Sequence, residues 1–411
     1  MNGNVKKTVP IEYKEVERAY RKVRRGGKAK GIDEESWQQF DANLKGNLYV
    51  IWNRMASGSY YPQAVKEVEI PKKDGRMRKL GIPTLRDRIA QQVVKAYMEE
   101  RIDKLFHENS YGYRPMKNAH QAIEQVKQNC YKQDWVIDMD ISNFFDEIDH
   151  ELMLKAVRHV VPDKWVEMYV RRWLEMPIQT KDGQILSRDG RGTPQGGVIS
   201  PLLANLYLHF AIDKWLNLHY PQTSFVRYAD DIIIHCNSKA TAERVLEAVT
   251  QRMTEVKLRV NKGKTRIVYC KDYRRKESHK EVQFEFLGFS FQPRPRKSKR
   301  DGKAFMAFAA EISNANQKRI RDEIKSIVLW RYPKVPLEDL ARHLNPKLRG
   351  WIRYYGLYSK KSLRRTLQKV DLKILNKLKK LHKWGHRKAA KQLQMVKQSS
   401  PDLFYHWQVG Y

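Results

Sequence analysis

The stretch that decides the fold is Ser224-Phe225-Val226-Arg227-Tyr228-Ala229-Asp230-Asp231-Ile232-Ile233-Ile234-His235-Cys236. Two short runs of β-branched and aromatic residues flank an acidic pair, which predicts a β-hairpin with the charge at its tip. Adjacent carboxylates repel, so such a turn is costly unless a cation lies between them. Mg²⁺ suits that place because it takes oxygen ligands and is often held by one or two carboxylates plus substrate phosphates. A solvated acidic turn is the alternative that the local sequence leaves open.

A second strand with acidic residues is predicted at 135–141, where Asp138 and Asp140 lie two residues apart and share one face. A carboxylate from this strand could complete a three-carboxylate metal cluster with Asp230 and Asp231. Two metals held there would activate an attacking 3′ hydroxyl and stabilise a leaving pyrophosphate. Spacing alone does not say whether Asp138 or Asp140 faces the metals.

The charge of the chain points to a polyanionic partner. Its 411 residues contain 80 Lys plus Arg against 46 Asp plus Glu, a net charge of +34. Nucleic acid fits this excess better than an anionic membrane. Residues 291–411 alone hold 30 Lys plus Arg and 8 Asp plus Glu, a net charge of +22. The partner is therefore expected to bind this basic part of the chain most strongly.

Several ordinary classes are excluded by the same sequence. No apolar run is long enough for a membrane helix, and the first 30 residues lack the apolar core of a signal peptide. The three cysteines, Cys130, Cys236 and Cys270, are far apart and form no paired motif. We therefore expect a reducing compartment, no structural zinc and no contact with a membrane.

Two further stretches could contact an anionic substrate. Residues 68–71 and 76–82 read as a hairpin whose tip would bring Lys72 and Arg78 together to grip a triphosphate. A charged edge that prevents strand pairing is the alternative. Gln195 lies in a glycine-rich turn, 191–201, that would allow a ligand to approach closely. A simple turn leading into the apolar helix at 202–215 explains the same residues.

The ordered motifs resemble those of bacterial group II intron-encoded reverse transcriptases with a maturase domain, over nearly the whole chain. They are Ile70-Pro71-Lys72 with Gly81-Ile82-Pro83, Tyr111-Gly112-Tyr113-Arg114-Pro115, 140–146, 191–197, Tyr228-Ala229-Asp230-Asp231, 261–265, Phe286-Leu287-Gly288-Phe289 and 345–351. The resemblance implies an α+β right-hand polymerase with fingers, a palm built on a small antiparallel sheet, and a helical thumb. It implies a helical, basic extension at 1–65, fingers and palm at 66–291, and at 292–411 a basic linker followed by the thumb and RNA-binding maturase region.

The resemblance also assigns roles to residues. Asp140, Asp230 and Asp231 would be the catalytic carboxylates and hold two Mg²⁺ ions, for which Mn²⁺ can substitute, so that Asp138 becomes structural. Phe145 would exclude the 2′ hydroxyl of a ribonucleotide. The remaining substrate contacts would be Lys72 and Arg78 on the triphosphate, with a one-residue slip to Lys73 and Lys79 left open, Gln195 against the nucleotide, and Lys264 as proton donor to pyrophosphate.

The resemblance implies an RNA-directed DNA polymerase that extends a DNA or RNA primer with dNTPs on an RNA template. It would also bind its group II intron RNA to assist splicing and retrohoming into a DNA target, in the bacterial cytoplasm. Longer members end in a zinc-bearing endonuclease with paired cysteines, whereas no cysteine follows Cys270; we expect no such nuclease. A non-catalytic RNA-binding maturase and a retron or CRISPR-associated reverse transcriptase are the alternatives.

Overall fold

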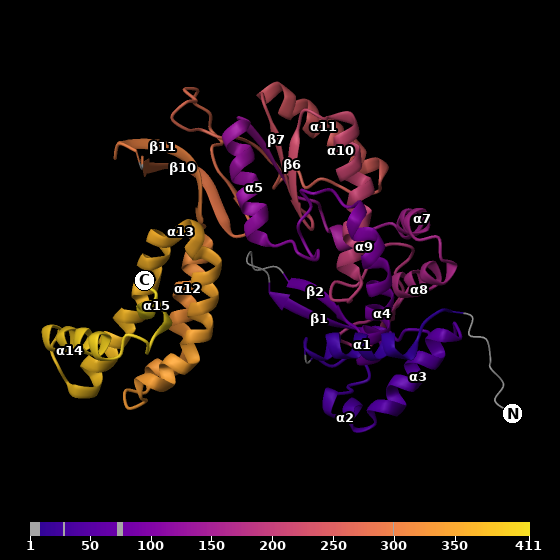
Figure 1. Cartoon of the computed structure of the whole chain (residues 1–411), viewed down its shortest axis with the longest axis horizontal. Helices are drawn as coiled ribbons and strands as arrows, with labels where there is room; N and C mark the ends of the chain where they lie inside the picture. Colours follow the sequence, from indigo (N-terminus) through magenta and orange to yellow (C-terminus); the bar gives the residue numbers. More distant parts are fainter. Residues whose placement is uncertain (1–8, 28, 72–76, 299) are drawn as a thin grey trace. The chain divides into compact units, whose positions relative to one another are not determined.

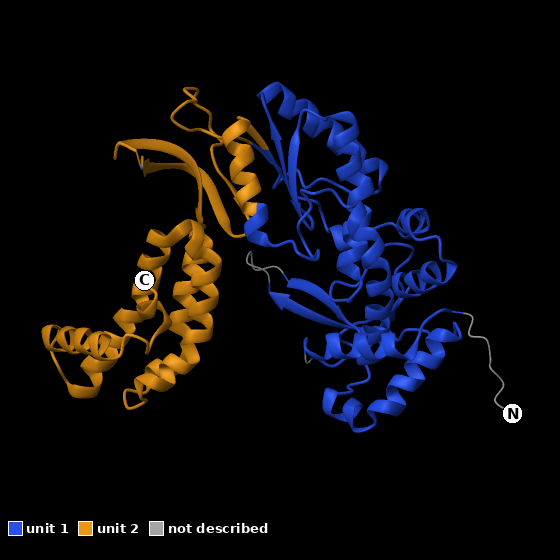
Figure 2. Cartoon of the chain, viewed as in Figure 1, with its two compact units in different colours: residues 1–122, 137–267 blue, residues 123–136, 268–411 orange. Residues whose placement is uncertain are grey.

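The computed structural model describes residues 9–27, 29–71, 77–298 and 300–411. The chain divides into two compact units, coloured separately in Figure 2. Unit 1 comprises Met1–Ala122 and Ile137–Ile267, and unit 2 comprises Ile123–Val136 and Val268–Tyr411. The helix α5, Ala119–Lys132, begins in the first unit and continues into the second.

Unit 1 is mostly helical and also contains β1 and β2, β4 and β5, and the β6–β7 hairpin (Figure 1). Helices α1 to α3 fall within the stretch predicted as a helical extension, and α4 follows the first hairpin. The helices of the unit are α1 Tyr13–Arg24, α2 Trp37–Ala42, α3 Leu44–Ala56, α4 Leu85–Ile102, α6 Phe144–Glu147, α7 His150–Val160, α8 Lys164–Leu174, α9 Ser200–Leu208, α10 Lys214–His219 and α11 Lys239–Glu255.

The first sheet contains the predicted basic hairpin. Strand β1, Val65–Pro71, pairs antiparallel with β2, Met77–Ile82, and the last pair is Pro71 with Met77. The sheet continues through β4, Ile178–Gln179, and β5, Ile185–Leu186, in the order β2-β1-β4-β5. The prediction of a hairpin is confirmed.

The second sheet carries the acidic residues and has the strand order β6-β7-β3-β8. Its strands are β3 Trp135–Met139, β6 Ser224–Tyr228, β7 Asp231–Cys236 and β8 Arg266–Tyr269. Residues Ile232 to Ile234 are all buried, so the sheet is covered on both faces; α10 and α11 lie beside the β6–β7 hairpin in Figure 1. Because β7 is hydrogen-bonded to β3, the two strands that carry the acidic residues are neighbours.

The apolar helix predicted at 202–215 is interrupted by a wider turn. Helix α9 passes into a π-helical segment, His209–Asp213, before α10 begins. Asn205, His209 and Asp213 are among the buried polar side chains of this element. Segments of π-helix often occur at functional sites, so the contacts of these buried polar residues bear on function.

Unit 2 contains a three-stranded sheet and a group of long helices. Its elements are β9 Phe284–Phe286, β10 Phe289–Lys297, β11 Ala304–Ile312, α12 Asn314–Ser326, α13 Leu337–His382, α14 His386–Ser399 and α15 Tyr405–Gln408. A helical thumb was expected in this part of the chain. The basic stretch from Leu363 to Leu381 lies within α13, so it is helical. Among the described residues, no helix is both long and apolar enough to cross a membrane.

The basic linker expected at 294–300 is a strand as far as Lys297. Residues 293–297 belong to β10, which pairs with β11 from Phe289↔Ile312 to Lys297↔Ala304. Proline cannot donate to a ladder, but Pro293 and Pro295 are two apart, so both nitrogens face the same edge. That edge is open because β9 pairs only with Phe289 to Phe291. The prolines therefore lie where no amide hydrogen is required.

Burial of His209 makes the stability of unit 1 depend on pH. Burial lowers the pKa of His209 from 6.5 to about 4. Between these values the unfolded chain binds the proton more readily, so stability falls as the pH drops from 6.5 towards 4. We expect His209→Phe to remove this contribution, which reaches roughly 3 kcal/mol from a shift of that size. The measurement is urea unfolding of wild type and variant at pH 7.5 and pH 4.5.

The comparison between the two proteins cancels other groups, including Asp87, whose pKa burial raises to about 6 and whose effect on stability has the opposite sign. His219→Phe, at an exposed histidine of the same unit, controls for the loss of an imidazole. Parallel pH profiles for wild type and His209→Phe would contradict the burial argument.

Candidate active site

The turn between β6 and β7 is held in an unusual backbone conformation. Tyr228 pairs with Asp231, so Ala229 and Asp230 form a two-residue turn. Ala229 has φ +56°, in the left-handed region that glycine, asparagine or aspartate usually occupies. For alanine this conformation costs on the order of 1–2 kcal/mol. The surrounding structure must therefore hold the turn in place, and Asp230 and Asp231 with it.

Part of that support is the loop at 107–114. A Cβ atom on Gly112 would lie 2.4 Å from the Ala229 nitrogen, so only glycine allows this approach. The Tyr111 amide donates to the Arg227 carbonyl at 2.8 Å. Arg114 fixes the loop by donating to the carbonyls of His107 and Ser110, at 2.7 and 2.8 Å. The motif around Gly112 therefore packs directly against the acidic turn.

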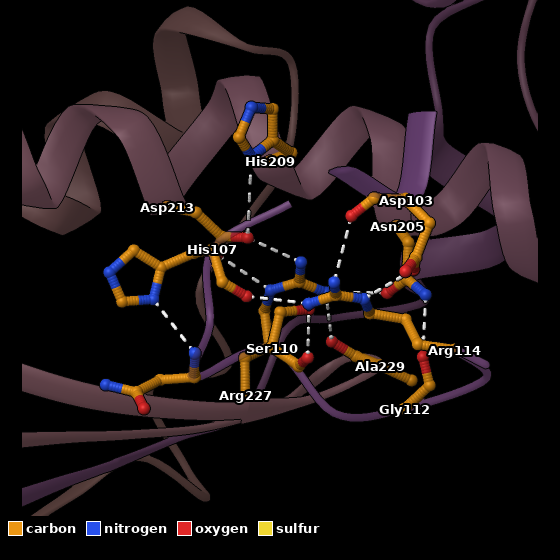
Figure 3. A network of polar contacts seen from close by, with 11 residues as sticks. Asp103, His107, Ser110, Gly112, Arg114, Asn205, His209, Asp213, Arg227 and Ala229 are labelled. Carbon is orange, nitrogen blue, oxygen red and sulfur yellow. Dashed lines mark hydrogen bonds and ion pairs between the residues drawn. The ribbon is translucent and has the colours of Figure 1, made fainter. Parts of the chain in front are cut away.

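The other part is a buried arginine on β6 (Figure 3). Arg227 donates to both carboxylate oxygens of Asp213, with Nε–Oδ1 2.8 Å and Nη2–Oδ2 2.6 Å. Its Nη1 also donates to Asn205 Oδ1 at 2.8 Å and to the Ala229 carbonyl at 3.1 Å. One guanidinium thus joins the π-helical segment, α9 and the strained turn.

Asp140 and Asp138, the two carboxylates between which spacing alone did not choose, have different neighbours. The Asp140 carbonyl accepts from the Asn261 amide at 2.8 Å, and its carboxylate lies 3.3 Å from Lys264 Nζ. Asp138 instead pairs with Arg266 of β8 at 3.4 Å. The 261–265 turn thus holds Asp140 and brings Lys264 to it, while Asp138 ties β3 to β8.

Asp140 and Asp230 are close enough to influence each other's charge. Burial raises the pKa of the Asp230 carboxyl above its ordinary value, and the negative charge of Asp140 raises it further. The positive charges of Arg78 and Arg227 act in the opposite direction on the same carboxyl. A cation bound between Asp140 and Asp230 would relieve their repulsion. Asp231, the first residue of β7, is exposed.

Arg78 and Gln195, separated by 117 positions in the sequence, meet in the structure. Arg78 Nε donates to Gln195 Oε1 at 2.9 Å, and the Gly81 amide donates to the Gln195 carbonyl at 2.9 Å. A Cβ atom on Gly196 would lie 2.7 Å from the Gly81 carbonyl oxygen. Gly196 therefore allows β2 to approach this turn closely. The hydrogen bond from Arg78 orients the Gln195 side chain.

Phe145 lies on the short helix α6. This helix begins directly after Asn143, which has φ +44°. The Phe145 carbonyl accepts from the Thr193 amide at 2.8 Å, so its helix is tied to the loop that carries Gln195. The side chain is half-buried. Lys72, and Lys73 in the alternative register, lie outside the described residues.

The predicted residues are brought together only in part. Asp140, Asp230, Lys264 and Arg78 are linked by contact or by charge, and Gln195 joins them through Arg78. Within the described residues, no three His, Cys, Asp or Glu side chains are placed closely enough to form a ready-made metal site. The set offered is a pair of carboxylates with Asp231 adjoining, which is the donor chemistry Mg²⁺ takes with substrate phosphates.

Sequence reasoning missed the residues beneath the turn. Arg227 follows Phe225 and Val226 in a strand that is otherwise apolar, and Asn205 and Asp213 interrupt an apolar helix. A charge inside an apolar strand is rarely buried without a partner, so it was a signal that a carboxylate had to meet it. The sequence did not indicate which one.

Comparison with known families agrees with this geometry. A family model described as reverse transcriptase (RNA-dependent DNA polymerase) matches residues 70–291, which is more than half of the chain. A second model, the group II intron maturase-specific domain, matches residues 317–394. The first match contains all the site residues described above. The second match runs from α12 through α13 into α14.

Two relatives have the same level of identity. Protein YkfC of Escherichia coli (strain K12) is 32% identical over 286 residues, covering 60% of this chain and 74% of that protein. Group II intron-encoded protein LtrA of Lactococcus lactis subsp. cremoris is 32% identical over 193 residues, 47% of this chain and 31% of LtrA. A solved telomerase from Candida albicans has 11% identity and a TM-score of 0.47, covering 90% of this chain and 67% of that one, a likeness too remote to carry an argument.

The close approach at Gly112 gives a test of the turn. We expect Gly112→Ala to lower the free energy of unfolding by about 1–3 kcal/mol, the usual cost of overpacking, because the new methyl group collides with the Ala229 backbone. Gly263→Ala is the control in the same unit, since its Cβ would meet only Asn261 Oδ1 at an ordinary 3.6 Å. Urea unfolding of both variants measures the difference, and equal stabilities would contradict the packing.

Proposed function

The chain belongs to the reverse transcriptase family, and from this premise we propose that it is an RNA-directed DNA polymerase that also binds a group II intron RNA. It adds dNTPs to a primer 3′ hydroxyl on an RNA template, and it assists the splicing of the intron and its insertion into a DNA target. The observation that carries the polymerase function is that Asp140 and Asp230 are close enough for their charges to interact, with Lys264 at 3.3 Å from Asp140 and the charge of Arg78 acting on Asp230.

Asp140, Asp230 and Asp231 are the residues that would hold divalent ions. The first two are a coupled pair of carboxylates, and Mg²⁺ is commonly held by one or two carboxylates with the remaining ligands from phosphates and water. When bound, two such ions lower the pKa of the attacking hydroxyl and stabilise the charge on the leaving oxygen. The aligned residues span 31% of the length of LtrA.

The other residues bind and orient the nucleotide. Arg78 presents a guanidinium that can hold a triphosphate through paired hydrogen bonds, and its contact with Gln195 fixes its direction. Lys264 lies against Asp140 and donates a proton to the pyrophosphate as it leaves. Phe145 forms the wall that a ribose 2′ hydroxyl would strike. Lys72 completes the grip on the triphosphate.

The RNA-binding role belongs to unit 2. Residues 317–394 match the maturase-specific domain, and residues 291–411 carry a net charge of +22. Such an excess binds phosphates strongly and makes the affinity fall steeply with salt. The aromatic residues that accompany the cations are partly used in the core, because Tyr355 is buried and the Tyr354 hydroxyl donates to the Leu287 carbonyl at 2.8 Å.

Replacement of one carboxylate tests the polymerase function. We expect Asp230→Asn to reduce primer extension on an RNA template with Mg²⁺ by at least about 100-fold, because a carboxylate that acts only in the transition state is lost. Asp138→Asn is the matched control, since Asp138, on β3, lies two residues before Asp140 and pairs with Arg266 of β8. Its activity is expected to stay within about threefold of wild type, measured as incorporated dNTP per minute.

Equal losses in the two variants would contradict the assignment of Asp230. Splicing assistance without any DNA synthesis by the wild type would favour the non-catalytic maturase instead. A retron or CRISPR-associated enzyme would be distinguished by flanking DNA that encodes no intron RNA.

The size of Phe145 tests substrate selection. We expect Phe145→Ala to raise the kcat/KM for an rNTP relative to the matching dNTP by about 10- to 100-fold, the range that steric contacts of this size supply. Single-nucleotide extension with each substrate measures the ratio. Phe144→Leu, at the buried neighbouring ring, controls for disturbance of α6 and should leave the ratio unchanged. An unchanged ratio in Phe145→Ala would remove this residue from the sugar site.

A further inference from the structure

The most deeply buried charges of unit 1 have no part in the function proposed above. The side chains of Arg227 and Asp213 are both 0% exposed, and two hydrogen bonds of 2.8 and 2.6 Å join them. Charges in such a place lose their hydration, and replacing a buried ion pair by apolar residues is often neutral or stabilising. The pair is therefore poorly explained by stability alone.

Two sets of hydrogen bonds connect the Asp213–Arg227 pair to the acidic turn. In the first, Arg227 Nη1 donates to the Ala229 carbonyl at 3.1 Å. In the second, the same Nη1 donates to Asn205 Oδ1, and Asn205 Nδ2 donates to the Gly112 carbonyl at 2.7 Å. Gly112 is the residue whose lack of a Cβ atom allows the Ala229 nitrogen to approach closely. Both sides of the left-handed Ala229 are thus held by one guanidinium, as Figure 3 shows.

The π-helical segment makes this arrangement possible. In a regular α-helix, residues eight apart differ by about 80° in direction, so Asn205 and Asp213 would diverge. The wider turn at His209–Asp213 takes up part of that difference. As a result, an amide and a carboxylate from one element reach the same side chain.

Only arginine can serve all these acceptors at once. Its planar fork donates to Asp213, Asn205 and Ala229 in fixed directions, whereas a lysine ammonium is a point charge on a flexible stem. The direction of the Ala229 peptide determines where the next two side chains point, and those are Asp230 and Asp231.

We propose that the Asp213–Arg227 pair, with Asn205, is a positioning device for catalysis: it fixes the left-handed Ala229 peptide and so aims the Asp230 and Asp231 carboxylates at the reacting phosphate. Neither Arg227 nor Asp213 touches substrate. This inference rests on the proposed polymerase function, and it adds that the carboxylates are effective only while the buried pair holds their turn. Displacements of about 1 Å at reacting groups can cost 100-fold in rate.

Two variants remove the device in different ways. Asp213→Leu combined with Arg227→Met keeps the volume and removes both charges, so no charge is left unpaired. Arg227→Lys keeps the charge and loses the fork. A control pair exists in unit 2, where Arg275 Nη1 and Asp272 Oδ2 are 3.3 Å apart and both side chains are buried. Asp272→Leu with Arg275→Met removes that pair, and the partly exposed Arg274 and Asp134, which also pair with it, lose one partner each.

The experiment is steady-state primer extension on folded protein, as judged by circular dichroism, with direct measurement of Mn²⁺ binding by the EPR signal of the free ion. We expect a 10- to 100-fold loss of kcat in both test variants, with KM for dNTP and affinity for the RNA template within about twofold of wild type. We also expect weaker Mn²⁺ binding. The control pair should leave kcat and Mn²⁺ affinity unchanged.

The outcomes separate this inference from the function on which it rests. Wild-type kcat in a folded test variant would overturn the positioning role and leave the polymerase function intact, as would an equal loss of kcat in the control pair. If the double variant fails to fold, Arg227→Lys decides by the same criteria. Absence of primer extension in the wild type would refute the polymerase function and this inference with it.

Discussion

Repulsion between Asp140 and Asp230 is the constraint on which the arrangement of unit 1 depends. Both carboxylates are half-buried, and for Asp230 burial and the charge of Asp140 raise the pKa above its ordinary value. Cations offset this: Lys264 lies 3.3 Å from Asp140, and the charges of Arg78 and Arg227 favour the ionised form of Asp230. Each cation comes from a different element. These elements must therefore fold together before the repulsion between the two carboxylates is offset.

Close approach of one backbone to another is what permits this assembly. Gly112 abuts Ala229, Gly196 abuts Gly81, and Gly288, with φ +82°, closes the β9–β10 turn where a side chain would meet Asn316. In each case a Cβ atom would come within 2.8 Å of its neighbour. Gly196 lies in the turn at 191–201, which was interpreted as a possible ligand contact, and the other two lie in motifs shared with the family. Their structural role explains their presence without excluding a nucleotide nearby.

The sequence predicted what depends on local pattern. The hairpins at 65–82 and 224–236 follow from alternation, and α9 follows from its apolar residues. The sequence did not predict that β10 continues to Lys297, because proline is counted against a strand unless one knows which edge its nitrogen faces. Spacing alone could not separate Asp140 from Asp138, because their ion-pair partners, Lys264 and Arg266, are more than 120 positions away.

The distribution of charge leads to one further step. Residues 291–411 hold +22 of the net +34, so the chain attracts a polyanion mainly through its carboxy-terminal part. The acidic turn must nevertheless lie beside the phosphates of the same polyanion, and carboxylates repel phosphates. Divalent ions placed between them change that repulsion into attraction, and phosphates in turn supply ligands that the carboxylates lack. On the proposed function, nucleic acid and metal therefore strengthen each other's binding at Asp140 and Asp230, and a site with few preformed protein ligands is what such mutual dependence requires.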